Sequence, residues 1–180
     1  MKVVAIVGMA GAGKSEVAGV FEKHDYRKVR FGDITDAELK NRGLEPNEEN
    51  ERYIRQQLRK EHGMAVYAKL NLPGIDSLLE SSNVVVDGLY SWEEYILLKE
   101  YYGGQFNTIA VWASPATRYG RLARRAKRPL TPEEAANRDK SEIENINKGG
   151  PIAMADFTIV NETSLEELEK ETERVLSVLE

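Results

Sequence analysis

The sequence contains no cysteine, which excludes a disulfide framework, a thiolate metal site and a cysteine nucleophile. Histidine is almost as scarce, because only His24 and His62 occur, and their spacing builds no metal site. Positive charge is not in excess either, since the formal net charge is −5. General affinity for nucleic acid usually needs a basic excess, so we expect no nucleic-acid partner.

Long hydrophobic runs are also missing. The apolar run after Lys2 ends at Gly8, too soon for a secretory segment or a membrane span. The composition, 41% hydrophobic and 31% charged over 180 residues, is typical of one globular domain. We therefore expect a single cytoplasmic domain over residues 1–180, monomeric or homodimeric, with no membrane partner.

What the chain does contain is an alternation of short apolar runs with longer polar-patterned stretches. The runs at 3–7, 27–31, 84–86, 108–112 and 157–160 predict strands, and stretches such as 91–102 and 164–179 predict helices. This alternation favours a parallel sheet between helices. Residues 3–7 and 84–86 are unbroken Val/Ile-rich runs, which places them at the centre of the sheet.

Two segments depart from this alternation. Residues 33–82 lack a good strand and predict helices at 33–42, 48–61 and 65–79, the last broken near Pro73 and Gly74. We interpret this segment as an inserted helical subdomain. Residues 101–132 contain no acidic residue and many arginines, and Thr131 and Pro132 predict the N-cap and first residue of a further helix.

The chemistry is concentrated in one motif. Residues 8–15, GMAGAGKS, match G-x-x-x-x-G-K-[ST] between a predicted strand and a predicted helix at 16–23. Such a loop (the P-loop) aims backbone N–H groups at phosphate oxygens, its lysine reaches the β and γ phosphates, and its serine can bind Mg²⁺. The alternative is a flexible glycine turn with a surface lysine. The predicted binding residues for ATP and Mg²⁺ are Gly8, Gly11, Ala12, Gly13, Lys14, Ser15 and Glu16.

The class of P-loop protein can be narrowed. Guanine-specific GTPases carry Asn-Lys-x-Asp after a late strand, whereas here Asn147 and Lys148 are followed by Gly149 and Gly150. Large motor ATPases need a longer chain. Small kinases therefore become the leading class.

The order of motifs carries a resemblance. The P-loop, then Phe31-Gly32-Asp33, a helical excursion, Val84-Val85-Val86-Asp87-Gly88, an arginine-rich segment and the closing residues 155–162 resemble the nucleoside monophosphate kinase group. The pattern is especially similar to small archaeal-type kinases related to adenylate, CMP and dephospho-coenzyme A kinases. The resemblance implies an α/β three-layer P-loop NTPase sandwich. It implies a five-stranded parallel sheet in the order 2-3-1-4-5, a helical acceptor-binding insertion (33–82) and a short arginine-rich lid (118–138).

The resemblance also assigns roles to two aspartates and a glycine. It implies that Asp33 is a general base for an acceptor hydroxyl or holds water around Mg²⁺; the alternative is an N-cap for a helix at 34–40. It implies that Asp87 acts on Mg²⁺ with Ser15, or lines the acceptor site together with Gly88. The alternative there is a simple Asp-Gly turn.

The lid arginines receive roles in the same way. Arg121 and Arg125 are four residues apart on a predicted helix at 115–126, so they share a face. The resemblance implies that Arg121 stacks on the donor base, Arg125 meets phosphate, and Arg128 and Arg138 close over the transferring group. The alternative for any one of them is a solvated helix face. We expect three other basic side chains to face solvent: Arg118, Arg124 and Lys127.

In the insertion, Arg55 is the candidate that grips the acceptor, although glutamates 48, 49 and 51 can instead pair with it at the surface. Four aromatic residues are expected to pack in the core: Trp92, Trp112, Tyr101 and Tyr102.

The sequence therefore predicts an ATP- and Mg²⁺-dependent kinase that phosphorylates a small nucleotide-like acceptor, a nucleoside monophosphate of AMP or CMP type. One alternative is dephospho-coenzyme A kinase-like phosphorylation of a ribose hydroxyl. An alternative of another class is a non-catalytic ATP-binding switch.

Overall fold

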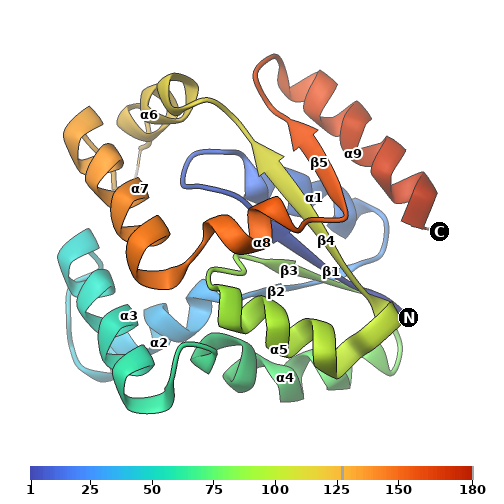
Figure 1. The fold of residues 1–180 in the computed structure, drawn as a ribbon, viewed down its shortest axis with the longest axis horizontal. Coiled ribbons are helices and arrows are strands. Elements are labelled where there is room, and N and C mark those ends of the chain that lie inside the picture. The colour runs from blue at the N-terminus through green and yellow to red at the C-terminus, as the bar shows by residue number, and fades with distance from the viewer. Residues whose placement is uncertain (127, 180) are drawn as a thin grey trace.

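The computed structural model describes residues 1–126 and 128–179, which form three layers with a sheet in the middle (Figure 1). Within these residues, β1 (Val3–Val7), β2 (Arg27–Arg30), β3 (Val84–Asp87), β4 (Phe106–Trp112) and β5 (Phe157–Val160) form one parallel sheet. The strand order is β2-β3-β1-β4-β5, which confirms the predicted topology. The predicted central placement of the first and third strands is confirmed as well.

The central strand shows why the sheet is covered on both faces. In β1, Val3, Ala5 and Val7 pack into one hydrophobic cluster, whereas Val4 and Ile6 pack into another on the opposite face. All five residues of β1 are fully buried. An unbroken apolar run is the pattern required of a strand with no solvent-facing side.

The helices divide between these two faces. The cluster with Val4 and Ile6 is completed by α1 (Lys14–Lys23) and α9 (Leu165–Leu179), and the other cluster by α4 (Val66–Leu79) and α5 (Trp92–Tyr102). Along the chain, β2 and β3 are separated by three helices, α2 (Gly32–Asn41), α3 (Glu48–His62) and α4. None of the helices in the described ranges has the length and apolar character needed to cross a bilayer.

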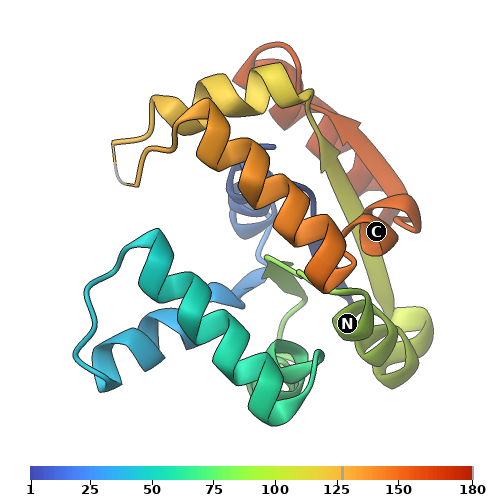
Figure 2. The same ribbon diagram turned by 60° about the vertical axis from the view of Figure 1, so that its left-hand side comes forward.

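The two helices that overlap the predicted lid segment, residues 118–138, lie opposite α2 and α3. These helices are α6 (Pro115–Ala123) and α7 (Pro132–Ile146), and Figure 2 shows them facing α2 and α3 across one side of the molecule. Thr131 is the N-cap of α7, forms a capping box with Glu134 and precedes Pro132, as predicted. Helix α6 ends at Ala123, before the predicted 126, and Lys127 lies outside the described residues.

Helix α4 continues through Pro73, although the sequence predicted a break there. Proline removes one backbone donor and disfavours a helix interior. The same helix buries Val66, Tyr67, Ala68 and Ile75 in the core. Burial of these side chains on both sides of the proline outweighs its local cost.

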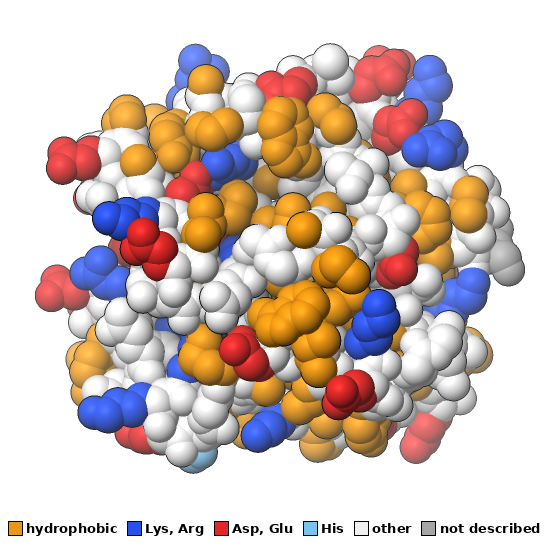
Figure 3. Space-filling view, viewed as in Figure 1, with side chains coloured by type: hydrophobic (Ala, Val, Ile, Leu, Met, Phe, Trp, Pro, Cys, Tyr) orange, Lys and Arg blue, Asp and Glu red, His pale blue; other side chains and the backbone are white. Residues whose placement is uncertain are grey.

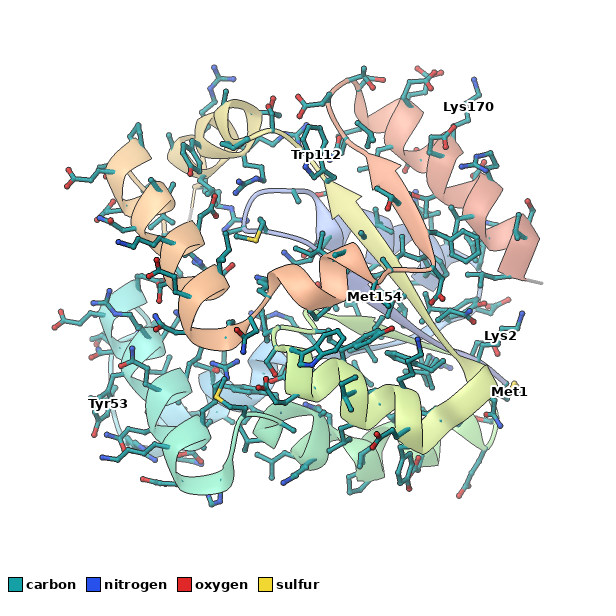
Figure 4. The ribbon with its side chains drawn as sticks, in the orientation of Figure 1. Met1, Lys2, Tyr53, Trp112, Met154 and Lys170 are labelled. Atoms are coloured by element: carbon teal, nitrogen blue, oxygen red, sulfur yellow. The ribbon has the colours of Figure 1, made fainter. Side chains whose placement is uncertain are left out.

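Two of the four aromatic residues expected in the core lie at the surface instead. Apolar side chains gather over α5 and the short helix α8 (Gly149–Ala153) in Figure 3. Trp112 ends β4 and is 46% exposed (Figure 4), and Tyr101 is 56% exposed. The hydroxyl of Tyr101 donates to Asp76 Oδ2 at 2.8 Å. Trp112 is the last residue of β4, and Tyr101 is the second-last residue of α5.

Candidate functional site

The P-loop joins the carboxyl end of β1 to the start of α1, and its glycines are required by its shape. Gly11 and Gly13 have φ angles of 80° and 104°, which favour glycine. A Cβ on Gly13 would also lie 2.3 Å from Asn161 Nδ2. The same amide donates to Ala12 O at 2.8 Å. Asn161 therefore stabilises the loop through this hydrogen bond. Sequence reasoning did not assign Asn161 to the site.

Lys14, the first residue of α1, bends back over this loop. Its Nζ donates to Gly8 O at 2.9 Å and to Met9 O at 3.1 Å. Burial, followed by the positive charge of Lys148, lowers the pKa of Lys14 to about 7. An anion bound on the loop would give this ammonium group a charged hydrogen-bond acceptor in place of the neutral carbonyl oxygens.

Ser15 and Asp87 meet at the carboxyl ends of two neighbouring strands. Parallel pairing places Asp87 of β3 opposite Ile6 of β1, and the Ser15 hydroxyl donates to Asp87 Oδ2 at 3.0 Å. Asp87 is 7% exposed. Hydroxyl and carboxylate oxygens are suitable Mg²⁺ ligands when a polyphosphate supplies others, so this donor set fits that ion. No group of three or more His, Cys, Asp or Glu side chains that could hold a metal occurs among the residues described.

Two cavities meet at the P-loop. The larger, of about 800 Å³, lies between the lid and α2–α3, and the smaller, of about 440 Å³, lies on the outer side of the loop. Lys14, Ser15 and Arg125 line both cavities. Glu16, Arg121 and Asn161 line the smaller one. Lys14 and Ser15, which follow the glycines of the loop, therefore contact both cavities.

The larger cavity is positively charged in a negatively charged protein. Among the described residues that line it, ten are Lys or Arg and seven are Asp or Glu. The whole chain carries a formal net charge of −5. Lysine and arginine side chains gathered in a concave space raise the local concentration of anionic ligands. Figure 3 shows charged side chains of both signs gathered where α7 faces α3.

Arg121 and Arg125 both line the smaller cavity beside the P-loop, but Arg125 lies beyond the end of α6, so the prediction that they share one helix face is wrong. Arg121 Nη2 donates to Asn161 O at 3.0 Å and to Asn161 Oδ1 at 3.2 Å. Arg125 is exposed at the rim of both cavities, and in the described structure it forms no ion pair. Partial desolvation of its guanidinium and the positive charge of Arg138 lower the pKa of Arg125. Arg125 is thus a cation without a counter-ion beside the P-loop.

The remaining predicted arginines line the larger cavity and are paired with glutamates of α3. Arg128 pairs with Glu51, and Arg138 Nη1 lies 3.1 Å from Glu48 Oε2. Arg55 lies 2.8 Å from Glu48 Oε1. Arg55 is therefore paired with a glutamate, as the alternative interpretation of the sequence expected, although its side chain also lines the cavity.

The prediction that Arg118 faces solvent is wrong. It is 4% exposed, and its guanidinium is bonded to Asp139 of α7 and to backbone carbonyls. The sequence pattern could not anticipate this because Asp139 lies 21 residues away on another helix. Arg124 is exposed, as predicted.

Asp33 is not an N-cap. Helix α2 begins at Gly32 with Phe31 as its N-cap, so Asp33 lies within the first turn. Its carboxylate is 68% exposed, accepts from Arg30 Nη1 at 2.6 Å and is absent from the described lining of both cavities. Its predicted role as a base stays a prediction.

Gly88 follows Asp87 with φ 99°, and a Cβ there would lie 2.7 Å from the Tyr90 hydroxyl.

Sequence reasoning missed several cavity residues, among them Tyr90, Glu142 and Lys148. Lys148 Nζ donates to Glu142 Oε2 at 2.7 Å, and Arg138 Nε donates to Glu142 Oε1 at 3.1 Å. Arg138 and Glu142 are four residues apart on one predicted helix, which was an available signal. Nothing in the sequence indicated that Lys148 would be buried.

Comparison with known proteins places the chain in a family. Residues 4–147 match the family model described as an AAA domain. A UPF0200 protein of Hyperthermus butylicus is 38% identical over 179 residues, covering 98% of this chain and 94% of that protein. The chain belongs to the UPF0200 family and contains an AAA domain. Another UPF0200 protein, from Thermococcus kodakarensis, is 36% identical and covers 97% of this chain and 96% of its own length.

Solved structures show that this UPF0200 chain has a P-loop kinase fold. A gluconokinase from Sinorhizobium meliloti superposes with a TM-score of 0.63 at 16% identity, covering 99% of this chain and 93% of that one. A dephospho-CoA kinase from Campylobacter jejuni gives 0.57 at 14% identity, covering 99% and 97%. These kinases are named for different acceptors, so the fold does not choose an acceptor.

Proposed function

We propose that this UPF0200 protein is an ATP-dependent kinase that transfers the γ-phosphoryl group of ATP to the phosphate of a small nucleotide-like acceptor. The acceptor is a nucleoside monophosphate of AMP or CMP type. One observation carries the proposal: the P-loop, with Lys14 and the Ser15–Asp87 pair, opens on one side to a small cavity beside Arg121 and on the other to a larger cationic cavity.

The smaller cavity is suited to the donor. In this proposal the polyphosphate of ATP lies on the amides of residues 8–15, with its base near Arg121. Lys14 exchanges the carbonyl oxygens of Gly8 and Met9 for phosphate oxygens. Ser15 and Asp87 would hold Mg²⁺, which supplies neutralising charge to the phosphate oxygens when bound.

The larger cavity is suited to an anionic acceptor. An oxygen of the acceptor phosphate forms a bond to the γ-phosphorus, the bond from that phosphorus to the β–γ bridging oxygen breaks, and ADP leaves with the bonding electrons. An ionised phosphate has no proton to lose, so no base is required. The excess of lysine and arginine in this cavity supports such an acceptor.

A hydroxyl acceptor, as in the dephospho-coenzyme A kinase-like chemistry that the sequence left open, is the second candidate. A hydroxyl must lose a proton, which requires a base. The predicted base, Asp33, is exposed and paired with Arg30. Asp33→Asn separates the two acceptors, because it should nearly abolish transfer to a hydroxyl and only weaken transfer to a phosphate.

A panel of acceptors tests the proposal. The protein is incubated with γ-labelled ATP, Mg²⁺ and each of several nucleoside monophosphates or dephospho-coenzyme A, and labelled products are separated. We expect a labelled nucleoside diphosphate that Lys14→Met does not form. Transfer to dephospho-coenzyme A alone favours the second candidate. Tight ATP binding without any labelled product favours the non-catalytic switch and overturns the kinase proposal.

A further inference from the structure

We propose that Lys148 is a second phosphate-binding lysine, which holds the phosphate of the acceptor in the larger cavity that it shares with Lys14. The inference rests on the proposed kinase function and adds a substrate-binding residue to it.

The chain places Lys148 inside the cavity by an abrupt turn. Helix α7 ends at Ile146, its C-cap Asn147 has a left-handed φ of 52°, and the Lys148 N–H donates to Glu142 O at 3.2 Å. Helix α8 starts immediately afterwards at Gly149. Lys148 is 1% exposed and lines the larger cavity.

Gly150 makes this placement possible. A Cβ on Gly150 would lie 2.6 Å from Trp92 Cε3, so α8 can pack against α5 at this distance only with glycine. Gly150, part of the Gly149-Gly150 pair that excluded a guanine-binding motif, thus has a structural role in packing the helix that directly follows Lys148, whereas nothing lies within 4 Å of a Cβ added at Gly149.

Burial lowers the pKa of Lys148, and two neighbours oppose this effect by favouring the charged ammonium group. Nζ lies 2.7 Å from Glu142 Oε2 and 5.2 Å from the centroid of the Tyr90 ring. A carboxylate and an aromatic face both favour a buried cation. Conversely, Lys148 and Arg138 outweigh the effect of burial and lower the pKa of Glu142 to about 2.

This ammonium group retains the capacity to bind a ligand. Lysine carries three N–H donors, and within the described residues Nζ donates a single hydrogen bond, to Glu142. Buried donors without partners are costly, so a ligand that accepts from them gains free energy. Phosphate oxygens are strong, charged acceptors of this kind.

The position of Lys148 selects the acceptor over the donor. Lys148 lines the larger cavity and, among the described lining residues, is absent from the smaller one. Its positive charge lowers the pKa of Lys14, and the charge of Arg55 on α3 contributes to lowering the pKa of Lys148. A phosphate between Lys14 and Lys148 would neutralise both cations where the acceptor meets the γ-phosphoryl group.

Substitution separates this role from a structural one. Lys148→Met removes the charge and keeps the length, Lys148→Arg keeps the charge, and Lys140→Met on the exposed face of α7 is the matched control. We expect Lys148→Met to lower kcat/KM for the nucleotide acceptor by about 10- to 100-fold, mainly through KM, as loss of a charged hydrogen bond does. The Kd for ATP should change less than about twofold, and Lys148→Arg should recover part of the loss.

A second variant guards against misfolding. Replacing both members of a buried ion pair by apolar residues is often neutral for stability, so Lys148→Met combined with Glu142→Met should fold and show the same rise in acceptor KM. If either folded variant keeps the wild-type acceptor KM, the inference is overturned while the kinase proposal stands. If the wild-type protein phosphorylates no acceptor, both are overturned.

Discussion

Arg118 of α6 and Asp139 of α7 form a buried, bidentate ion pair. Arg118 Nη1 donates to Asp139 Oδ1 at 2.9 Å and Nη2 to Oδ2 at 2.6 Å. Nη1 also donates to Ala10 O of the P-loop at 3.1 Å. One guanidinium therefore connects both lid helices to the phosphate-binding loop.

Removal of one member of this pair should destabilise the fold strongly. In Arg118→Met the carboxylate of Asp139 stays buried without its partner, which costs about 3–5 kcal/mol in comparable cases. Urea unfolding measures the change in the free energy of unfolding. Arg124→Met, at an exposed position on the same segment, should change it by less than about 0.5 kcal/mol. Equal stability of the two variants would contradict the burial of Arg118.

Glycine substitutions test the shape of the P-loop. Gly13→Ala forces a side chain into a left-handed conformation and against Asn161, so we expect loss of ATP binding and a destabilised protein. Gly19→Ala in α1, where nothing lies within 4 Å of the added Cβ, should stabilise the helix by about 0.5–1 kcal/mol. Nucleotide titration and thermal unfolding measure both effects. Normal ATP affinity in Gly13→Ala would refute the required conformation.

Arg125 should contribute to turnover through its unpaired charge. If the kinase proposal holds, Arg125→Ala should lower kcat by about 100-fold, since a guanidinium that neutralises a transferring phosphoryl group has effects of at least that order. The acceptor assay measures this change. Arg124→Ala, whose side chain is exposed and outside the described cavity linings, should keep wild-type kcat. A kcat for Arg125→Ala equal to that of Arg124→Ala would exclude the role.

Glu142 should make stability depend on acid pH. Burial raises its pKa, but Lys148 and Arg138 outweigh burial and lower it from the ordinary 4.5 to about 2. A carboxyl with a lowered pKa stabilises the folded state above pH 4.5 and loses this contribution as pH falls towards 2. The free energy of unfolding should therefore fall less between pH 5 and 3 in Glu142→Gln than in the wild-type protein. Glu167→Gln, at an exposed position on α9, should retain the wild-type slope. An unchanged slope in Glu142→Gln would refute this assignment.

The sequence by itself determined the sheet and the phosphate-binding loop, because both depend on local patterns. Unbroken apolar runs such as Val3–Val7 predict buried parallel strands, and the spacing of Gly8, Gly13 and Lys14 predicts a loop whose backbone turns towards an anion. The family resemblance added the strand order, which local patterns do not contain.

Tertiary structure alone decided which charged side chains are buried and which face one another. Arg118, expected in solvent, is buried and bonded to Asp139, and Lys148 is buried and bonded to Glu142. Asp33 is exposed at the start of α2. A charged side chain is buried only where another element brings it a counter-ion or hydrogen-bond partners, and that pairing depends on helices distant in the sequence rather than on neighbouring residues.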